Sequence, residues 1–380
     1  MRRVAIAGVG MTPFGRHPER SLRDLAGEAV RASLADAGIA PERLQMACVG
    51  NAFGGIVTGQ EAVRGQVALQ DVVPRGIPIF NVENACASSA SAFHLAWLSV
   101  AAGQCDIALA MGVEKLYHAD REVSSRALRS AADMENRDYD GNFFMGLYAQ
   151  RARDYSKQSG ATPRHYAMVS AKNRAHGSLN PYAQFRKPVT VEEVLEAPVI
   201  VDPLTRLMCS PIGDGAAAAV LVGGAAARGL RRPVWVRASV VVGGGAGEPI
   251  GARAARLAYE RAGIGPEDVD VIELHDGAAP GELQLYEELG LCRPGEGPEL
   301  LERGDTTLGG RIPVNPGGGL IARGHPVGAT GVAQLVELVW QLRGEAGDRQ
   351  VTGACVGLAE NSGGYVAGDS AAGSAHILSR

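Results

Sequence analysis

Three residues combine reactive side chains with a local sequence that could position them: Cys86, His275 and His325. Cys86 lies in NACASSASA, directly before a run that is typical of a helix. Amide N–H groups at a helix start favour a thiolate, so we expect a lowered thiol pKa and a nucleophilic sulfur. A lone cysteine among alanines is also a common packing residue, and the sequence around Cys86 alone leaves both interpretations open.

His325 lies in the glycine-rich segment VNPGGGLIARGHPVGATG (314–331). Gly324 and Pro326 are expected to fix a turn around it, and a histidine held in this way could present a ring nitrogen to a thiol or a carbonyl oxygen. Asn315 precedes the glycine run and could hydrogen-bond a catalytic histidine or a water molecule. The alternative is a purely structural glycine turn.

His275 ends a predicted buried strand within VDVIELHDG (269–277). Polar residues at the carboxyl end of a buried strand are where α/β folds place ligand-binding groups, although a surface-exposed strand end is an equal alternative. Gly363, in ENSGG (360–364), could offer a free backbone N–H, or it could belong to a structural turn.

The elements that must carry these residues follow from alternating strand-like and helix-like runs. VAIAGVG (4–10) predicts a buried strand, and residues 21–38 predict an amphipathic helix opened by Ser21 and closed by Gly38. This alternation continues through the chain and predicts an α/β fold with mostly buried sheets. Residues 84–104 and 324–344 each read as a small-residue turn feeding a helix, which suggests a duplicated α/β unit.

Composition excludes several classes of protein. The 37 Lys+Arg and 41 Asp+Glu give a net charge of −4, and no basic stripe is present, so we expect no nucleic-acid partner. No uninterrupted apolar stretch of about 18 residues occurs, so we expect no membrane partner. The six cysteines form no CxxC pair, which predicts reduced thiols, no metal site and a cytoplasmic location.

Six segments together resemble the thiolase superfamily and, within it, the sterol-carrier-protein-type (SCP2-type) and acetyl-CoA acetyltransferase-like proteins. They are NACASSASA, GVEK (112–115), KNRAHGSLNPYAQFR (172–186), DPLTRLMCSPIGDGAAA (202–218), ELHDG (273–277) and NPGGGLIARGHPVGATG (315–331). The resemblance implies a five-layer α-β-α-β-α fold built from two similar halves. The expected organisation is an N-terminal half (1–115 and 201–230), an inserted loop region over the active site (116–200), a C-terminal half (231–366) and a flexible tail (367–380).

The resemblance also implies the roles of the candidate residues. Cys86 would take an acyl group from an acyl-CoA, or another acyl thioester such as an acyl-carrier thioester, and pass it to a carbon nucleophile or to CoA. His325 would accept or share the thiol proton, His275 would polarise the second thioester carbonyl, and the N–H groups of Cys86 and Gly363 would bind the oxyanion. The thioester is a substrate, and no cofactor is expected. A homodimer is implied, and some relatives pair with a small protein carrying an OB fold and a zinc ribbon.

The sequence departs from the thiolase pattern at the second acid/base cysteine. The usual Cys-x-Gly place reads Asn361-Ser362-Gly363, and the SCP2-type place after the His-Asp pair reads Gly277. Three hypotheses follow from this. The first is a thiolase-like acyltransferase in which Cys86 is acylated and either the acceptor does not need the missing thiol or His275 serves as the base. The second is a decarboxylating condensing enzyme of the ketosynthase kind with a Cys-His-His set. The third is an aldolase or scaffold subunit that works with the small partner protein.

Overall fold

The computed structural model describes residues 1–135, 143–245 and 247–380. Residues 136–142, which belong to the predicted inserted region, lie outside this description. The strands are β1 (Val4–Met11), β2 (Met46–Gly50), β3 (Ile79–Val82), β4 (Ile107–Glu114), β5 (Val199–Val201), β6 (Leu204–Thr205), β7 (Gly215–Gly223), β8 (Val234–Gly243), β9 (Val271–Glu273), β10 (Val356–Gly363) and β11 (Ala372–Ser379). The helices are α1 (Leu22–Ala37), α2 (Gly54–Thr58), α3 (Arg64–Leu69), α4 (Ser88–Ala101), α5 (Arg121–Arg129), α6 (Phe143–Ser159), α7 (Pro163–Ser178), α8 (Val191–Leu195), α9 (Ile250–Ala262), α10 (Ala279–Glu288), α11 (Gly297–Glu302), α12 (Gly319–Arg323) and α13 (Thr330–Arg343).

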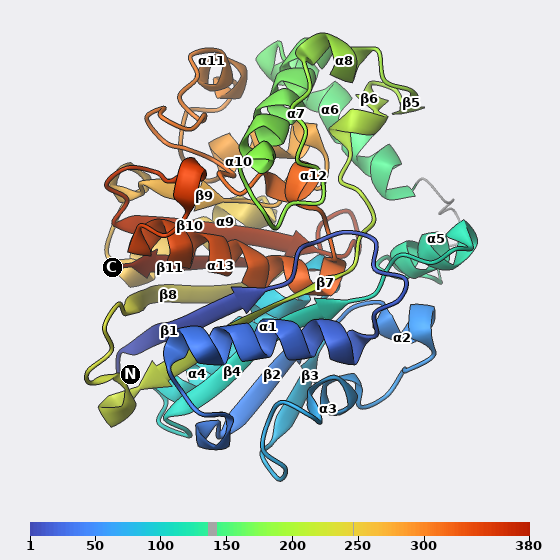
Figure 1. The fold of residues 1–380 in the computed structure, drawn as a ribbon. Coiled ribbons are helices and arrows are strands. Elements are labelled where there is room, and N and C mark those ends of the chain that lie inside the picture. The colour runs from blue at the N-terminus through green and yellow to red at the C-terminus, as the bar shows by residue number, and fades with distance from the viewer. Residues whose placement is uncertain (136–142, 246) are drawn as a thin grey trace.

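The strands of both halves join in one sheet, with the order β3-β2-β4-β7-β1-β8-β11-β10-β9. In the first half, β2 is parallel to β3 and β4, and β7 is antiparallel to β4 and β1. The second half repeats this pattern, because β9 is parallel to β10 and to a short bridge at Val314, and β11 is antiparallel to β10 and β8. The halves meet where β1 pairs with β8 (Figure 1). The predicted duplication is therefore confirmed.

Side chains alternate between the two faces of each strand, so different helices pack on the two faces of the sheet. In β7, Ala216, Ala218, Val220 and Val222 pack in a cluster with α1, whereas Ala217, Ala219 and Leu221 pack in a second cluster with α4 and α13. Side chains two apart share a face of a strand, so each strand serves two helical layers. The second cluster also takes residues from β10 and β11, whose other face packs with α7, α9 and α10. Helices α4 and α13 thus form the layer between the two half-sheets, as the expected five-layer α-β-α-β-α fold requires.

The first helix follows the local signals of the sequence. The Ser21 side chain accepts a hydrogen bond from the Asp24 N–H, and Gly38 closes α1 with a φ of 62°. This is the left-handed conformation that glycine adopts without steric cost. The predicted start and end of this helix are confirmed, and its apolar face covers the first half-sheet.

The C-terminal segment is not a flexible tail. Residues Ala372–Ser379 form β11, which lies between β8 and β10 and is buried along its whole length. The expectation was wrong because the serine and glycine residues of this segment read as a linker. Such small side chains also fit a strand that is covered on both faces.

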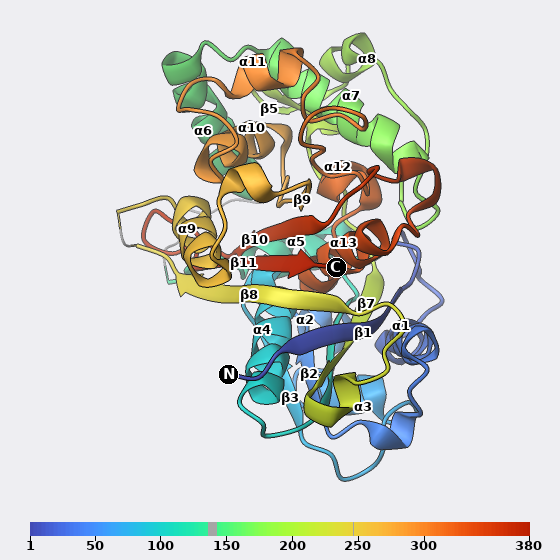
Figure 2. The same cartoon turned by 90° about the vertical axis from the view of Figure 1, so that its left-hand side faces the viewer.

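Helices α6, α7 and α8 of the inserted region gather with α10, α11 and α12 beyond β9, at one end of the sheet (Figure 2). They bring residues of the middle of the chain close to the second half-sheet. Within the part of the chain that the structure describes, no helix has both the length and the apolar character needed to cross a bilayer.

Candidate active site

Cys86 stands in a tight turn directly before α4. The turn spans Ala85–Ala87, and Ala85 has a φ of 47°, which is unusual for a residue with a side chain. The carboxylate of Glu83 accepts from the Ala85 N–H at 2.6 Å, and the Ser88 hydroxyl donates to the Ala85 carbonyl at 2.6 Å. These bonds hold the turn so that the half-buried sulfur faces the other half of the molecule.

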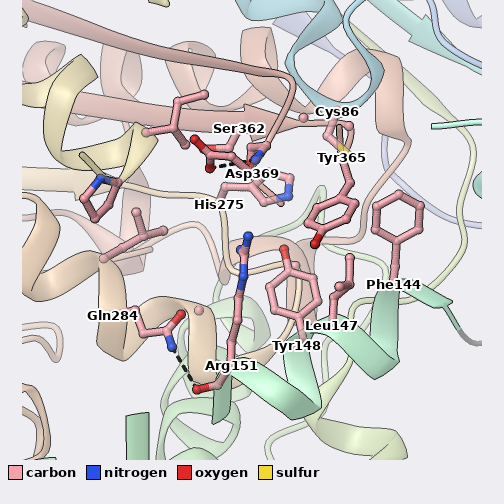
Figure 3. A pocket seen from close by; sticks show the side chains of 18 of the residues that line it. Cys86, Phe144, Leu147, Tyr148, Arg151, His275, Gln284, Ser362, Tyr365 and Asp369 are labelled. Carbon is pink, nitrogen blue, oxygen red and sulfur yellow. Dashed lines mark hydrogen bonds between the residues drawn. The ribbon is translucent and has the colours of Figure 1, made fainter. Parts of the chain in front are cut away.

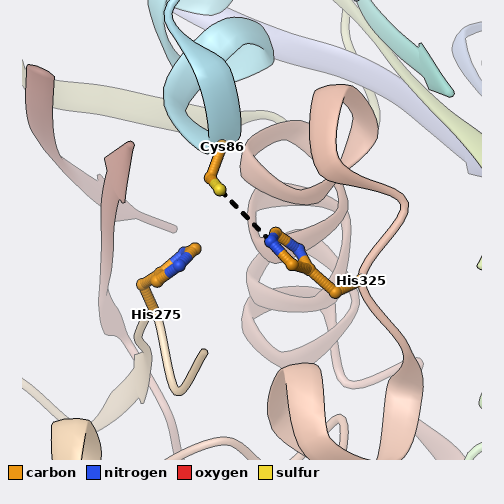
Figure 4. Close-up of side chains that lie close together, drawn as sticks. All are labelled: Cys86, His275 and His325. Atoms are coloured by element: carbon orange, nitrogen blue, oxygen red, sulfur yellow. Dashed lines mark hydrogen bonds between the residues drawn. The ribbon is translucent and has the colours of Figure 1, made fainter. Parts of the chain in front are cut away.

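His325 comes from the start of the α13 region and meets Cys86 across the central layer. Its Nε2 lies 3.3 Å from the Cys86 sulfur, although the residues are 239 positions apart (Figure 4). The Thr330 hydroxyl donates to the Pro326 carbonyl at 3.1 Å and lies 2.7 Å from His325 Nδ1. That hydroxyl hydrogen is engaged, so Nδ1 must donate to Thr330, and Nε2 presents its lone pair to the thiol.

Both members of this pair are neutral at rest. Burial, with a smaller contribution from Glu114, raises the pKa of the Cys86 thiol to about 12, while the N–H groups of Cys86 and Gly364 act in the opposite direction. Burial also holds the pKa of His325 well below its usual range, with His275 and Arg323 adding to the effect. The predicted lowering of the thiol pKa is therefore wrong, because loss of hydration outweighs the helix-start amides. Cys86 can therefore act as a nucleophile only if its proton passes to His325 as the sulfur attacks.

His275 completes the set from the end of β9. Its ring lies 5.2 Å from that of His325, centroid to centroid. Its Nδ1 lies 3.2 Å from the Asn361 amide nitrogen, which also donates to Gln334 Oε1 at 3.1 Å. Gln334 is oriented in turn by donating to the Glu360 carbonyl at 2.8 Å. Because a carbonyl can only accept, this chain of bonds places the proton of His275 on Nε2.

The reactive atoms of Cys86, His275 and His325 all lie within 4.8 Å of one another. A thiolate and two imidazoles are also ligands for a soft or borderline metal such as zinc, so the same compact set could hold an ion. Burial lowers the pKa of His275 to about 4, so it is a neutral hydrogen-bond donor at physiological pH.

Glu360 is a buried acid beside this set that the sequence interpretation did not single out. Its carboxylate accepts from the His275 backbone N–H at 3.1 Å and from the Ser362 hydroxyl. Burial raises its pKa to about 7. The sequence analysis considered only the backbone of ENSGG, and the signal that could have revealed Glu360 is an acidic residue directly after the apolar run VGLA of a predicted strand.

Glu114 explains the GVEK segment. At the end of β4, its carboxylate accepts from the N–H groups of Ala52 at 3.1 Å and Gly328 at 2.8 Å. Gly328 has no room for a side chain, since an added Cβ would lie 2.9 Å from that carboxylate. Glu114 therefore ties the His325 loop of the second half to the first half.

The two supporting residues have different places. Asn315 is fully buried, and its side chain accepts from the Leu274 N–H at 2.9 Å and donates to Glu282 at 2.8 Å. The expectation that it bonds a catalytic histidine is not met, because its side chain holds the segment before His275 instead. Gly363 packs against the nucleophile turn, where an added Cβ would lie 2.7 Å from the Cys86 nitrogen.

A cavity of about 840 Å³ opens over the three reactive groups. It is lined on one side by Cys86, His275 and His325 and on the other by side chains of α6, among them Phe144, Tyr148 and Arg151 (Figure 3). The inserted region thus supplies the wall that faces the sulfur, and the cavity has the size of a small-molecule site.

Comparisons with known proteins agree with this geometry. Residues 4–225 match the family model "Thiolase, N-terminal domain", and residues 249–380 match "Thiolase C-terminal domain-like". The chain is 42% identical to an acetyl-CoA acetyltransferase of Methanothermobacter thermautotrophicus over 100% of both chains. It is 40% identical to the benzoylsuccinyl-CoA thiolase subunit BbsB of Thauera aromatica, over 92% of this chain and 91% of that protein.

It is also 38% identical to sterol carrier protein 2 of Bos taurus, over 95% of this chain and 70% of that protein. Among solved structures, the Ltp2-ChsH2(DUF35) aldolase superposes with a TM-score of 0.82 at 24% identity, over 99% of this chain and 97% of that chain, which shows the shared fold. The matched domains, these relatives and the duplicated five-layer fold lead to one conclusion: the chain belongs to the thiolase superfamily, is SCP2-type thiolase-like, and is an acyltransferase.

Proposed function

We propose that the protein forms an acyl-enzyme on Cys86 from an acyl-CoA and then transfers the acyl group to CoA or to a carbon nucleophile. The observation that carries this proposal is the 3.3 Å contact between the Cys86 sulfur and the unprotonated Nε2 of His325. His325 takes the thiol proton as the sulfur attacks the thioester carbonyl. The thioester is the substrate, and the chemistry needs no further cofactor.

The oxyanion of the attacked thioester needs hydrogen-bond donors near the sulfur. We assign this task to the backbone N–H of Cys86 together with the amide of the β10 end at Gly363 or Gly364. Two observations support this assignment. Gly363 packs closely on the Cys86 turn, and the amide of Gly364 lowers the pKa of the Cys86 thiol. His275, with its proton on Nε2, then binds the carbonyl oxygen of the second thioester.

The first experiment is acylation followed by intact mass spectrometry. Incubation with acetyl-CoA and longer acyl-CoAs should add one acyl group to the wild-type protein and none to Cys86→Ala. Cys355→Ala is the matched control, because Cys355 is an exposed thiol that could react without catalysis. An equal adduct on the wild type and Cys86→Ala, or no adduct on the wild type with any thioester, would contradict the proposal.

One alternative arrangement has specific support. The Thauera aromatica relative is named as a subunit, so a second polypeptide, such as the small OB-fold and zinc-ribbon protein, is the second candidate arrangement. A decarboxylating condensing enzyme would use the same Cys-His-His set. It is distinguished by condensation with malonyl-CoA that releases CO₂, whereas the acyltransferase proposed here releases none. The six free cysteines support the proposed cytoplasmic location.

A further inference from the structure

Two glycines after His275 make room for one aromatic ring. A Cβ added to Gly277 would lie 2.4 Å from the Tyr148 hydroxyl oxygen and 3.2 Å from His275 Nε2. A Cβ added to Gly281 would lie 3.3 Å from Cε1 of the same ring. The phenol of Tyr148 therefore fills the space beside His275 that a side chain at position 277 would otherwise occupy.

Position 277 matters because it is one of the two places where the resemblance leads us to expect the second acid/base thiol. The chain has glycine there, and an oxygen acid from α6 stands in the same space. No signal in the sequence around residue 277 indicates this, since Tyr148 comes from the inserted region, well over a hundred positions earlier.

The Tyr148 hydroxyl is available to a ligand. It lines the cavity with Cys86, His275 and His325, and Figure 3 shows it on the opposite wall, pointing toward His275. Among residues 1–135, 143–245 and 247–380, no group accepts from or donates to this hydroxyl. A phenol held by packing without a hydrogen-bond partner is free to bond a reacting atom.

We propose that the Tyr148 hydroxyl is the proton donor and acceptor at the carbon α to the thioester, in place of the absent second thiol. The proposal rests on the acyl-enzyme function above and names the group that completes it. Tyr148 touches the reacting atoms and is therefore a catalytic residue in this scheme, whereas Gly277 and Gly281 only make room for it.

The step balances in the direction of C–C cleavage. Cys86 attacks the β-keto carbonyl of a β-ketoacyl-CoA as its proton passes to His325. The Cα–Cβ bond breaks, its electron pair moves to Cα, and Tyr148 gives its proton to Cα to release the shorter acyl-CoA. The tyrosinate takes the thiol proton of incoming CoA, whose sulfur attacks the acyl-Cys86. The departing Cys86 sulfur recovers its proton from His325.

Burial raises the pKa of Tyr148, Arg151 acts in the opposite direction, and Cys86, Glu360 and Asp276 add to the rise, so the phenol is protonated at neutral pH. A protonated group is ready to donate in cleavage, whereas removal of an α-hydrogen needs the less populated tyrosinate. The rate of α-hydrogen removal should therefore rise about tenfold per pH unit from pH 7 to pH 10.

The test measures exchange of the α-hydrogens of acetyl-CoA in D₂O between pH 7 and pH 10, beside acyl adduct formation by intact mass. The wild type should exchange at least ~100-fold faster than Tyr148→Phe, a typical contribution of a positioned acid or base. Both proteins should form the adduct on Cys86. Tyr166→Phe is the matched control, since the Tyr166 hydroxyl is bound to Ser156 and to the Ala152 carbonyl in the core and should exchange like the wild type.

Equal exchange in the wild type and Tyr148→Phe, or no exchange by the wild type above the buffer rate, overturns the role of Tyr148. Exchange by the wild type without any adduct overturns the acyl-enzyme function instead and leaves the role of Tyr148 supported, so the two failures are distinguishable. The double variant Tyr148→Ala/Gly277→Cys should exchange at least ~10-fold faster than Tyr148→Ala, because it returns an acid/base group to the same space. A double variant that is no faster contradicts the claim that the two positions share one task.

Discussion

At the scale of single residues, the site is a set of neutral groups whose orientation is fixed by hydrogen bonds. Thr330 sets the tautomer of His325, and Asn361 sets that of His275. Both imidazoles have lowered pKa values because they are buried. In the proposed mechanism, positive charge develops on His325 only during attack, when a nearby negative charge would stabilise it.

Glu360, which accepts from the His275 N–H, is one buried acid beside the site that could supply that charge, and it predicts a pH dependence. Its pKa is raised to about 7, so the carboxyl is neutral below pH 7 and negative above it. Acylation of Cys86 should therefore accelerate about tenfold as the pH rises through 7, which corresponds to about 1.4 kcal/mol of stabilisation of the developing imidazolium. Single-turnover acylation between pH 5.5 and pH 9 measures this.

Glu360→Gln is the matched variant, because an amide oxygen can still accept from the His275 N–H while the charge is lost. Its acylation rate should be lower above pH 7, and its rise through pH 7 should be smaller than in the wild type; any remaining rise would come from Glu114, whose pKa burial also raises to about 7. If the variant kept the same inflection near pH 7, another group would be responsible.

At the scale of elements, the proposed chemistry depends on the close approach of α4 and α13, because Cys86 and His325 lie in the turns that lead into these helices. Gly331 is the contact point, since an added Cβ would lie 2.6 Å from the Ala90 nitrogen. Backbone cannot move aside cheaply, so the helices must separate to accept a larger residue.

Gly331→Ala should therefore lower the free energy of unfolding by ~1–3 kcal/mol, a typical cost of overpacking. It should also slow acylation at least ~10-fold, because the Cys86–His325 contact lengthens. Thermal denaturation and single-turnover acylation measure the two effects. Gly146→Ala in α6 is the control, since an added Cβ there meets no atom within 4 Å, and it should be as stable as the wild type or more so. Equal behaviour of the two variants would show that the helix contact does not position the site.

The elements also show how far the sequence alone can lead. Local signals found α1, the turn before α4 and the strand β9, which ends two residues before His275, because caps, glycines and alternation act over a few residues. The pairing of Cys86 with His325 followed from the resemblance. The contacts that orient the site could not be predicted, because Gln334, Asn361 and Tyr148 come from α13, β10 and α6, which are far apart in the chain. The burial that raises the Cys86 pKa and the central place of β11 likewise depend on the whole fold.

At the scale of the whole molecule, one edge of the sheet differs from the other. The β9 edge has the bridge at Val314 beside it, and helices lie beyond it (Figure 2). The β3 edge ends the sheet on the opposite side. On β3 the side chain of Phe80 is 52% exposed, and exposed strand edges with apolar side chains invite pairing with another chain.

We therefore expect a homodimer in which β3 of one protomer lies beside β3 of its partner. Sedimentation velocity should give a mass about twice the 39.5 kDa of one chain, and Phe80→Glu should shift the protein to the monomer. Leu95→Glu is the control, because Leu95 is an exposed apolar residue of α4 that is not on this edge strand, and it should leave the dimer intact.

Dimer formation through β3 should also affect the site, because the Cys86 turn follows β3 in the chain by only a few residues. If pairing orders this edge, the Phe80→Glu monomer should also acylate more slowly. A wild-type monomer with full acylation would show that the site needs no second copy.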